Sequence, residues 1–124
     1  MLHFSDIDTV WPRICCVLFD LMEPSEIDHL VASCRFGSAV VLASEDGVVI
    51  LTLRAPDGEL ELLVLAAIGR GKNLVEAYLP ALRHVALEIG AHRITFQPRR
   101  RGWGRRLDDR WSLREDGFYA LEVA

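Results

Sequence analysis

The sequence has no apolar run long enough to span a membrane. The longest uninterrupted run, Leu62 to Ile68, has seven residues, whereas a membrane helix needs about 20. Cysteine is also scarce, because the chain of 124 residues holds three, of which two are adjacent and none has a CxxC spacing. An odd number without a pairing motif is typical of a reducing compartment. These absences exclude a disulfide framework and predict a cytoplasmic protein without a membrane span.

The chain also lacks the pattern of a metal site. Its four histidines are scattered without HxH or HxxxH spacing, so no metal is expected. The three cysteines, at positions 15, 16 and 34, fall in predicted helices and are expected to be small core or near-core residues.

Charge is unevenly distributed along the chain. The net charge is −4, but residues 1–62 hold three basic and eleven acidic side chains, whereas residues 63–124 hold eleven basic and seven acidic ones. Attraction between the two halves explains this more simply than a nucleic-acid surface does. A hydrophobic fraction of 51% excludes a disordered chain and is enough for one domain over residues 1–124.

Helical spacing of apolar residues opens the sequence. The spacing i, i+3, i+4, i+7 predicts a helix over residues 8–22, capped by Asp8 or Thr9. A second helix is expected directly after it, capped by Ser25 and ended by Gly37.

Strand signals follow from residue 38 to residue 68. The apolar runs 39–44, 48–54 and 59–68 are separated by Asp-Gly pairs at 46–47 and 57–58, and Asp-Gly between apolar runs favours a hairpin. We therefore predict an antiparallel meander. Its third strand alternates at its start and then becomes wholly apolar, so its first half should meet water and its second half should lie between two layers.

The remaining chain alternates helix and strand. We expect a long helix over residues 74–89, in which Pro80 causes a kink or delays the regular part, a strand at 94–96, one or two helical turns within 102–109, and a hairpin of 111–115 with 118–123. The link between 59–68 and 93–97 is long enough for a crossover, which predicts parallel neighbours. The fold class is α+β, a mixed and mostly antiparallel sheet flanked by helices, with the order α-α-β-β-β-α-β-α-β-β.

A glycine-bearing turn joins the third strand to the long helix. In Ile68-Gly69-Arg70-Gly71-Lys72-Asn73, free backbone N–H groups and a helix N-terminus would favour an anion. The alternative is a plain strand-to-helix turn with two solvated basic side chains. The spacing is too short for a P-loop, and Asn73 stands where that motif has Ser or Thr.

The order of elements resembles that of the GNAT (acyl-CoA N-acyltransferase) superfamily. The small GNAT-like proteins of phages and prophages are similar through Asp8-Thr9-Val10-Trp11-Pro12, Leu79-Pro80-Ala81-Leu82 and Arg101-Gly102-Trp103. The resemblance covers nearly the whole chain.

This resemblance implies a site for acetyl-CoA. The pantetheine arm would lie against Leu65, Ala66 and Ala67, and the backbone of residues 69–73, that is Gly69, Arg70, Gly71, Lys72 and Asn73, would hold the pyrophosphate. The sequence departs from the family at two places. Ala66 stands where the family loop begins with Arg or Gln, and Arg110-Trp111 replaces the usual Gly-Phe pair, so the cofactor loop is degenerate.

An acetyltransferase needs a base for the amine and an acid for the departing thiolate. Glu61, at the solvated start of the predicted third strand, is the first candidate base, with Glu59 on the same face as the second. Ordinary polar alternation on a half-exposed strand is the competing interpretation. Tyr119 is a candidate acid, or else a packing residue of the last hairpin.

Seven arginines fall between residues 99 and 114, with Trp103 and Trp111 among them. Interleaved acids and a negative overall charge favour a solvated or ion-paired surface first, a coenzyme or protein contact second, and a nucleic-acid surface last.

Two functions remain open. One is an acyl-CoA dependent N-acetyltransferase acting on an unknown amine. The other is a non-catalytic phage or prophage accessory protein that keeps the fold and binds a phage protein or a second copy of itself.

Overall fold

The structure is a computed structural model that describes residues 2–69, 74–97 and 110–123. A single mixed sheet forms its centre. Its strands are β1 (His3–Ser5), β2 (Ala39–Ala43), β3 (Gly47–Arg54), β4 (Glu61–Gly69), β5 (Arg93–Phe96), β6 (Trp111–Leu113) and β7 (Tyr119–Glu122). Across the sheet they lie in the order β1-β2-β3-β4-β5-β7-β6. β4 and β5 run parallel, and the other paired strands of the described residues run antiparallel. The predicted α+β class and the parallel pair are confirmed.

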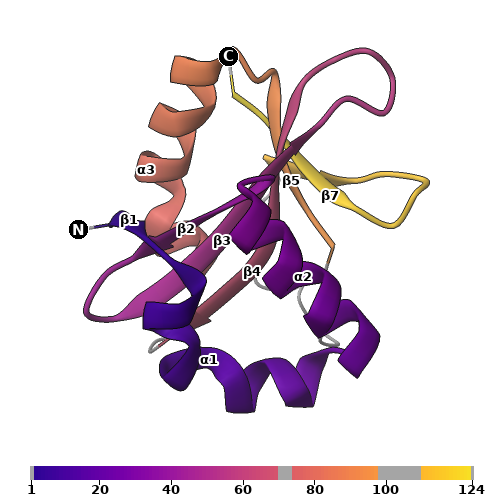
Figure 1. Cartoon of the computed structure of the whole chain (residues 1–124). Helices are drawn as coiled ribbons and strands as arrows, with labels where there is room; N and C mark the ends of the chain where they lie inside the picture. Colours follow the sequence, from indigo (N-terminus) through magenta and orange to yellow (C-terminus); the bar gives the residue numbers. More distant parts are fainter. Residues whose placement is uncertain (1, 70–73, 98–109, 124) are drawn as a thin grey trace.

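Helices cover both faces of the sheet (Figure 1). α1 (Ile7–Leu21) and α2 (Pro24–Phe36) cover one face, and α3 (Leu74–Ile89) covers the other. The apolar side chains of α1 and α2 pack on β2, on β3 and on the end of β4. Those of α3 pack on a second cluster that also takes in β5, β6 and β7. No helix among the described residues is both long enough and apolar enough to cross a membrane.

The N-terminal caps of the first two helices differ from prediction. Asp6 rather than Asp8 or Thr9 caps α1, because its carboxylate accepts a hydrogen bond from the Thr9 backbone N–H at 2.8 Å. This bond is the first cause of the lowered pKa of Asp6. α2 is capped by Glu23 and not by Ser25, because Pro24 occupies the first helical position and the helix starts two residues earlier than predicted.

The three-strand meander is confirmed, but the burial of β4 is the reverse of the prediction. Residues 61–64 are buried, whereas residues 65–67 are only partly buried. Glu61, the charged residue of this first half, is covered by arginine side chains from neighbouring segments. The second half is partly open because β5 does not continue beside it. β1 was not predicted, because its three residues are too few for a strand pattern.

The long helix and the last hairpin are confirmed. α3 contains Pro80 within its span, and β6 and β7 pair on either side of the Asp116-Gly117 turn. The helical turns expected within residues 102–109 lie outside the described residues. Among the cysteines, Cys15 and Cys34 are partly buried, but Cys16 is exposed, so its expected place near the core is wrong.

Candidate functional site

β4 and β5 are neighbours over only half of β4. Their parallel pairing ends at Val64 opposite Phe96, which is also the last residue of β5. β4 continues to Gly69, paired on its other edge with β3. From residue 65 onward, the edge of β4 that faced β5 has no strand beside it in the described part of the chain.

A β-bulge lies where the two strands part. Ile50 and Leu51 are adjacent in β3, but their partners in β4 are Ala66 and Val64. Leu65 is therefore an extra residue, and both it and the following alanine pack toward α1 and α2. A bulge bends its strand and increases the local twist. The bend thus coincides with the point at which β4 leaves β5.

Partly buried residues, two of them small, line the free edge of β4. Leu65, Ala66 and Ala67 are partly buried, and Ile68 is buried. Short side chains leave the backbone of the strand accessible, and unpaired N–H and C=O groups of an edge can pair with an extended ligand. The edge is therefore suited to an elongated molecule that carries amide groups.

Gly69 ends β4 and meets the β2–β3 turn. A Cβ atom at this position would lie 2.2 Å from the carbonyl oxygen of Asp46 and 2.6 Å from Cα of Gly47. Only glycine fits, so Gly69 has a packing reason that is independent of any ligand. The other residues of the predicted anion site, 70–73, lie outside the described residues, and their role stays a prediction.

The first turn of α3 carries an acidic side chain that is already paired. The carboxylate of Glu76 accepts hydrogen bonds from Arg110 Nη2 at 3.2 Å and from Trp111 Nε1 at 3.3 Å. These bonds join the start of α3 to the start of β6. The N-terminus of a helix carries a partial positive charge, and the carboxylate of Glu76 partly neutralises it.

Glu61 begins β4 and is fully buried. Its Oε2 atom accepts hydrogen bonds from Arg54 Nε at 2.9 Å and from Thr95 Oγ1 at 3.4 Å. Its Oε1 atom accepts a hydrogen bond from Arg114 Nη1, and Arg93 Nη1 lies 3.5 Å from the same oxygen. Three guanidinium groups thus surround one carboxylate, and we call these five residues the buried ion cluster.

Exposed carboxylates form the rim of the buried ion cluster. Arg93 pairs with Glu59 and, at 3.3 Å, with Asp57. Arg114 donates to Asp116 at 2.6 Å, and this bond is the first cause of the lowered pKa of Asp116. The pKa of Asp57 is lowered chiefly by a hydrogen bond from the backbone N–H of Glu59. The pKa of Arg114 is raised by its bonds to Asp116 and to the buried carboxylate.

The structure corrects the expected setting of Glu61. The side chain was predicted to face water, but it is 0% exposed, and both of its oxygens accept hydrogen bonds from arginine. It lies in the paired half of β4, about 13 Å along the strand from the bulge. These contacts favour a structural role that holds β3, β4, β5 and the β6–β7 turn together. A role for Glu61 as base stays a prediction.

The three arginines of the buried ion cluster were not predicted as partners of Glu61. For Arg54 a signal was present, because a hairpin centred on Asp57-Gly58 places residue 54 opposite residue 61, as observed. Opposite charges at such facing positions attract. Arg93 and Arg114 come from strands and turns whose register with β4 only the folded sheet defines.

Aromatic rings gather at the end of β5. The ring of Phe96 packs edge-on against Trp111, with centroids 5.2 Å apart, and stacks on Tyr119 at 5.6 Å. Tyr119 lies opposite Phe96 in the sheet, which brings it close to the point where β4 and β5 part. Its packing role is evident, and its role as acid stays a prediction.

Of the arginines between residues 99 and 114, two are described by the structure. Arg110 pairs with Glu76, and Arg114 pairs with the buried carboxylate and with Asp116. For these two, the predicted ion-paired interpretation is confirmed. The other five lie outside the described residues.

Comparisons with known proteins support the fold. No family profile and no curated protein matches the chain. A protein from Desulfovibrio desulfuricans, assigned as a GNAT-family acetyltransferase, has 18% sequence identity and a TM-score of 0.67. The match covers 100% of this chain and 99% of that protein's chain. A protein from Staphylococcus aureus, assigned as an acetyltransferase, is 13% identical with a TM-score of 0.64 over 100% and 99% of the two chains. A GNAT-family acetyltransferase from Listeria monocytogenes is 13% identical with a TM-score of 0.59 over 97% and 91%. The chain therefore has the GNAT fold.

Proposed function

We propose that this protein is an acyl-CoA dependent N-acyltransferase of the cytoplasm, with acetyl-CoA as donor and an amine as acceptor. The observation that carries the proposal is the parting of β4 and β5 after Val64 and Phe96, beside the bulge at Leu65. The fold neighbours, which are assigned as acetyltransferases, support the same reaction class.

The free edge of β4 fits an acyl-CoA. The pantetheine arm is extended and carries two amides, and along one edge the backbone of Leu65, Ala66 and Ala67 has no strand beside it within residues 2–69, 74–97 and 110–123. The backbone N–H groups of residues 69–73, with Arg70 and Lys72, would take the pyrophosphate at the start of α3. When bound, acetyl-CoA would supply an activated acyl group for transfer to the amine.

Proton transfer is the step that the chain must provide itself. An ammonium has to lose a proton before its nitrogen can attack an acyl group, and a positioned carboxylate commonly takes it, directly or through water. Glu61 is the predicted base, but it would have to release a hydrogen bond from Arg54 or Arg114 before it could accept a proton. Tyr119 is the predicted acid.

Calorimetric titration with acetyl-CoA tests the proposal. We expect saturable binding and a rise in melting temperature at millimolar ligand. Ala66→Phe should weaken binding at least about tenfold, because a ring packed against α1 and α2 beside the bulge would displace the free edge of β4. Ala55→Phe, at an exposed alanine that directly follows β3, is the control and should bind as the wild type does. The absence of heat and of a thermal shift with the wild type would exclude the proposal.

The engaged oxygens of Glu61 favour a second candidate, a non-catalytic protein that keeps the fold. The resemblance to phage and prophage proteins suggests an accessory role of this kind, with a homo-oligomer or a phage protein as partner. Release of CoA thiol in the presence of acetyl-CoA and a polyamine such as spermidine distinguishes the two. Turnover supports the transferase, whereas acetyl-CoA binding without turnover by any amine tried supports the accessory protein.

A further inference from the structure

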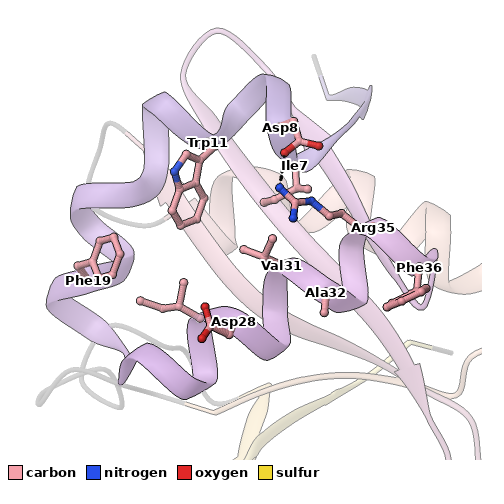
Figure 2. Close-up of a pocket in the computed structure, with 10 residues that line it drawn as sticks. Ile7, Asp8, Trp11, Phe19, Asp28, Val31, Ala32, Arg35 and Phe36 are labelled. Carbon is pink, nitrogen blue, oxygen red and sulfur yellow. Dashed lines mark hydrogen bonds and ion pairs between the residues drawn. The ribbon is translucent and has the colours of Figure 1, made fainter.

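A furrow of about 560 Å³ separates α1 from α2. In Figure 2 the two helices run in front of the sheet, with the furrow between them. Its lining comes entirely from these helices, and includes the buried Ile7 and Ile27 and the partly buried Val31. This volume lies in the range of small-molecule sites, and the lining shares no residue with the free edge of β4.

Two aromatic rings form a corner at one end of the furrow. The rings of Trp11 and Phe19 have centroids 6.2 Å apart and an interplanar angle of 78°. Phe19 is 59% exposed although it is a large apolar side chain. Figure 2 shows both rings on α1 facing Asp28 and Val31 of α2 across the furrow. Aromatic faces and one carboxylate therefore surround the same space.

The two carboxylates of the furrow differ in their ion pairing within the part of the chain that the structure describes. Asp8, at the other end of the furrow, pairs with Arg35 at 2.7 Å, whereas Asp28 has no ion-pair partner within the described ranges 2–69, 74–97 and 110–123. The segment 6–36, which contains both helices, holds six acidic and two basic residues. The two helices that line the furrow therefore carry an excess of negative charge, which favours a cationic ligand.

We propose that the furrow binds the ammonium group of a small organic cation, between the rings of Trp11 and Phe19 and the carboxylate of Asp28. Cations are attracted to aromatic faces, most strongly to that of Trp. The carboxylate adds a charge contact, and Val31 with Ile27 provides an apolar surface for the carbon stem. The proposal does not rest on the acyltransferase function.

Choline and its uncharged carbon isostere, 3,3-dimethylbutan-1-ol, are the probes, because they share shape and differ in charge. Titration of the ¹⁵N-labelled protein at constant ionic strength follows the indole resonance of Trp11, which Trp11→Phe identifies. We expect a saturable shift with choline, with Kd on the order of millimolar, and at least about tenfold weaker binding of the alcohol.

Asp28→Asn should weaken choline binding at least about fivefold and leave the alcohol unchanged. Asp28 is exposed, so the variant should fold. Asp20→Asn, an exposed acid on α1 that does not line the furrow, is the control and should bind choline as the wild type does. Equal binding of the two probes, full affinity in Asp28→Asn, or no saturable shift would each overturn the proposal.

Discussion

Replacing Glu61 by glutamine tests whether the buried ion cluster stabilises the fold. The substitution keeps the shape of the side chain and removes its charge, so Arg54, Arg93 and Arg114 would face one another without their shared carboxylate. Breaking a buried ion pair costs about 3–5 kcal/mol. Because glutamine retains one acceptor oxygen, we expect a loss of about 3 kcal/mol in the free energy of unfolding.

Urea denaturation followed by circular dichroism measures this loss. With a slope of about 1–3 kcal/mol per molar urea, the midpoint should fall by roughly 1–3 M at an unchanged slope. Glu59→Gln is the matched control, since Glu59 also pairs with Arg93 but its side chain is 57% exposed. A surface pair of this kind contributes at most about 1 kcal/mol.

The opposite result would refute the structural interpretation. If Glu61→Gln lost less than about 1 kcal/mol and yet abolished acetyl transfer, Glu61 would act on the reacting amine instead. If both variants lost the same small amount, the hydrogen bonds around Glu61 would contribute no more than surface contacts do.

Three further predictions concern single residues. Gly69→Ala should destabilise the fold by about 2–3 kcal/mol, because a Cβ would strike the backbone of the β2–β3 turn; Gly58→Ala, with φ of 88° in open space, should cost only about 1–2 kcal/mol, and equal losses in urea would contradict this. The pKa of Asp116 lies below its ordinary 3.8 in the folded state, so its stabilisation is present above that value and is lost as the pH falls through the folded pKa; Asp116→Asn should therefore lower the melting temperature near about pH 6, and this effect should shrink as the pH falls below 3.8. Cys16 is exposed, whereas burial raises the pKa of Cys34, so iodoacetamide followed by peptide mapping should label Cys16 first, and equal rates would be inconsistent with this.

The sequence was informative where a local pattern determines the structure. The Asp-Gly pairs at 46–47 and 57–58 stand between apolar runs and place the meander within one or two residues of its observed bounds. The crossover length from β4 to β5 is enough to predict parallel strands, and the order of elements is enough to suggest the GNAT fold. Each of these predictions depends on contacts close in sequence or on general rules of chain connection.

The prediction failed where burial depends on distant segments. Alternation of Glu59 and Glu61 with leucines is the pattern of a half-solvated strand, and nothing within that run indicates that Arg93 and Arg114 cover Glu61. The bulge at Leu65 also leaves no trace, because an all-apolar run fits either face of the sheet at every position. The buried half and the partly open half of β4 were therefore exchanged in the prediction.

The buried ion cluster and the bulge together determine where β4 and β5 part. A slip of one residue in β4 would turn Glu61 toward the apolar side of α3, where no arginine of the cluster could reach it. The pairing of Glu61 with Arg54 on one side and Arg93 on the other therefore fixes the register of the first half of β4. Once that register is fixed, the extra residue at Leu65 falls directly after the last β4–β5 pair. We infer that the charges at one end of β4 maintain the free edge at the other, so weakening the cluster should impair acyl-CoA binding even if Glu61 never touches the ligand.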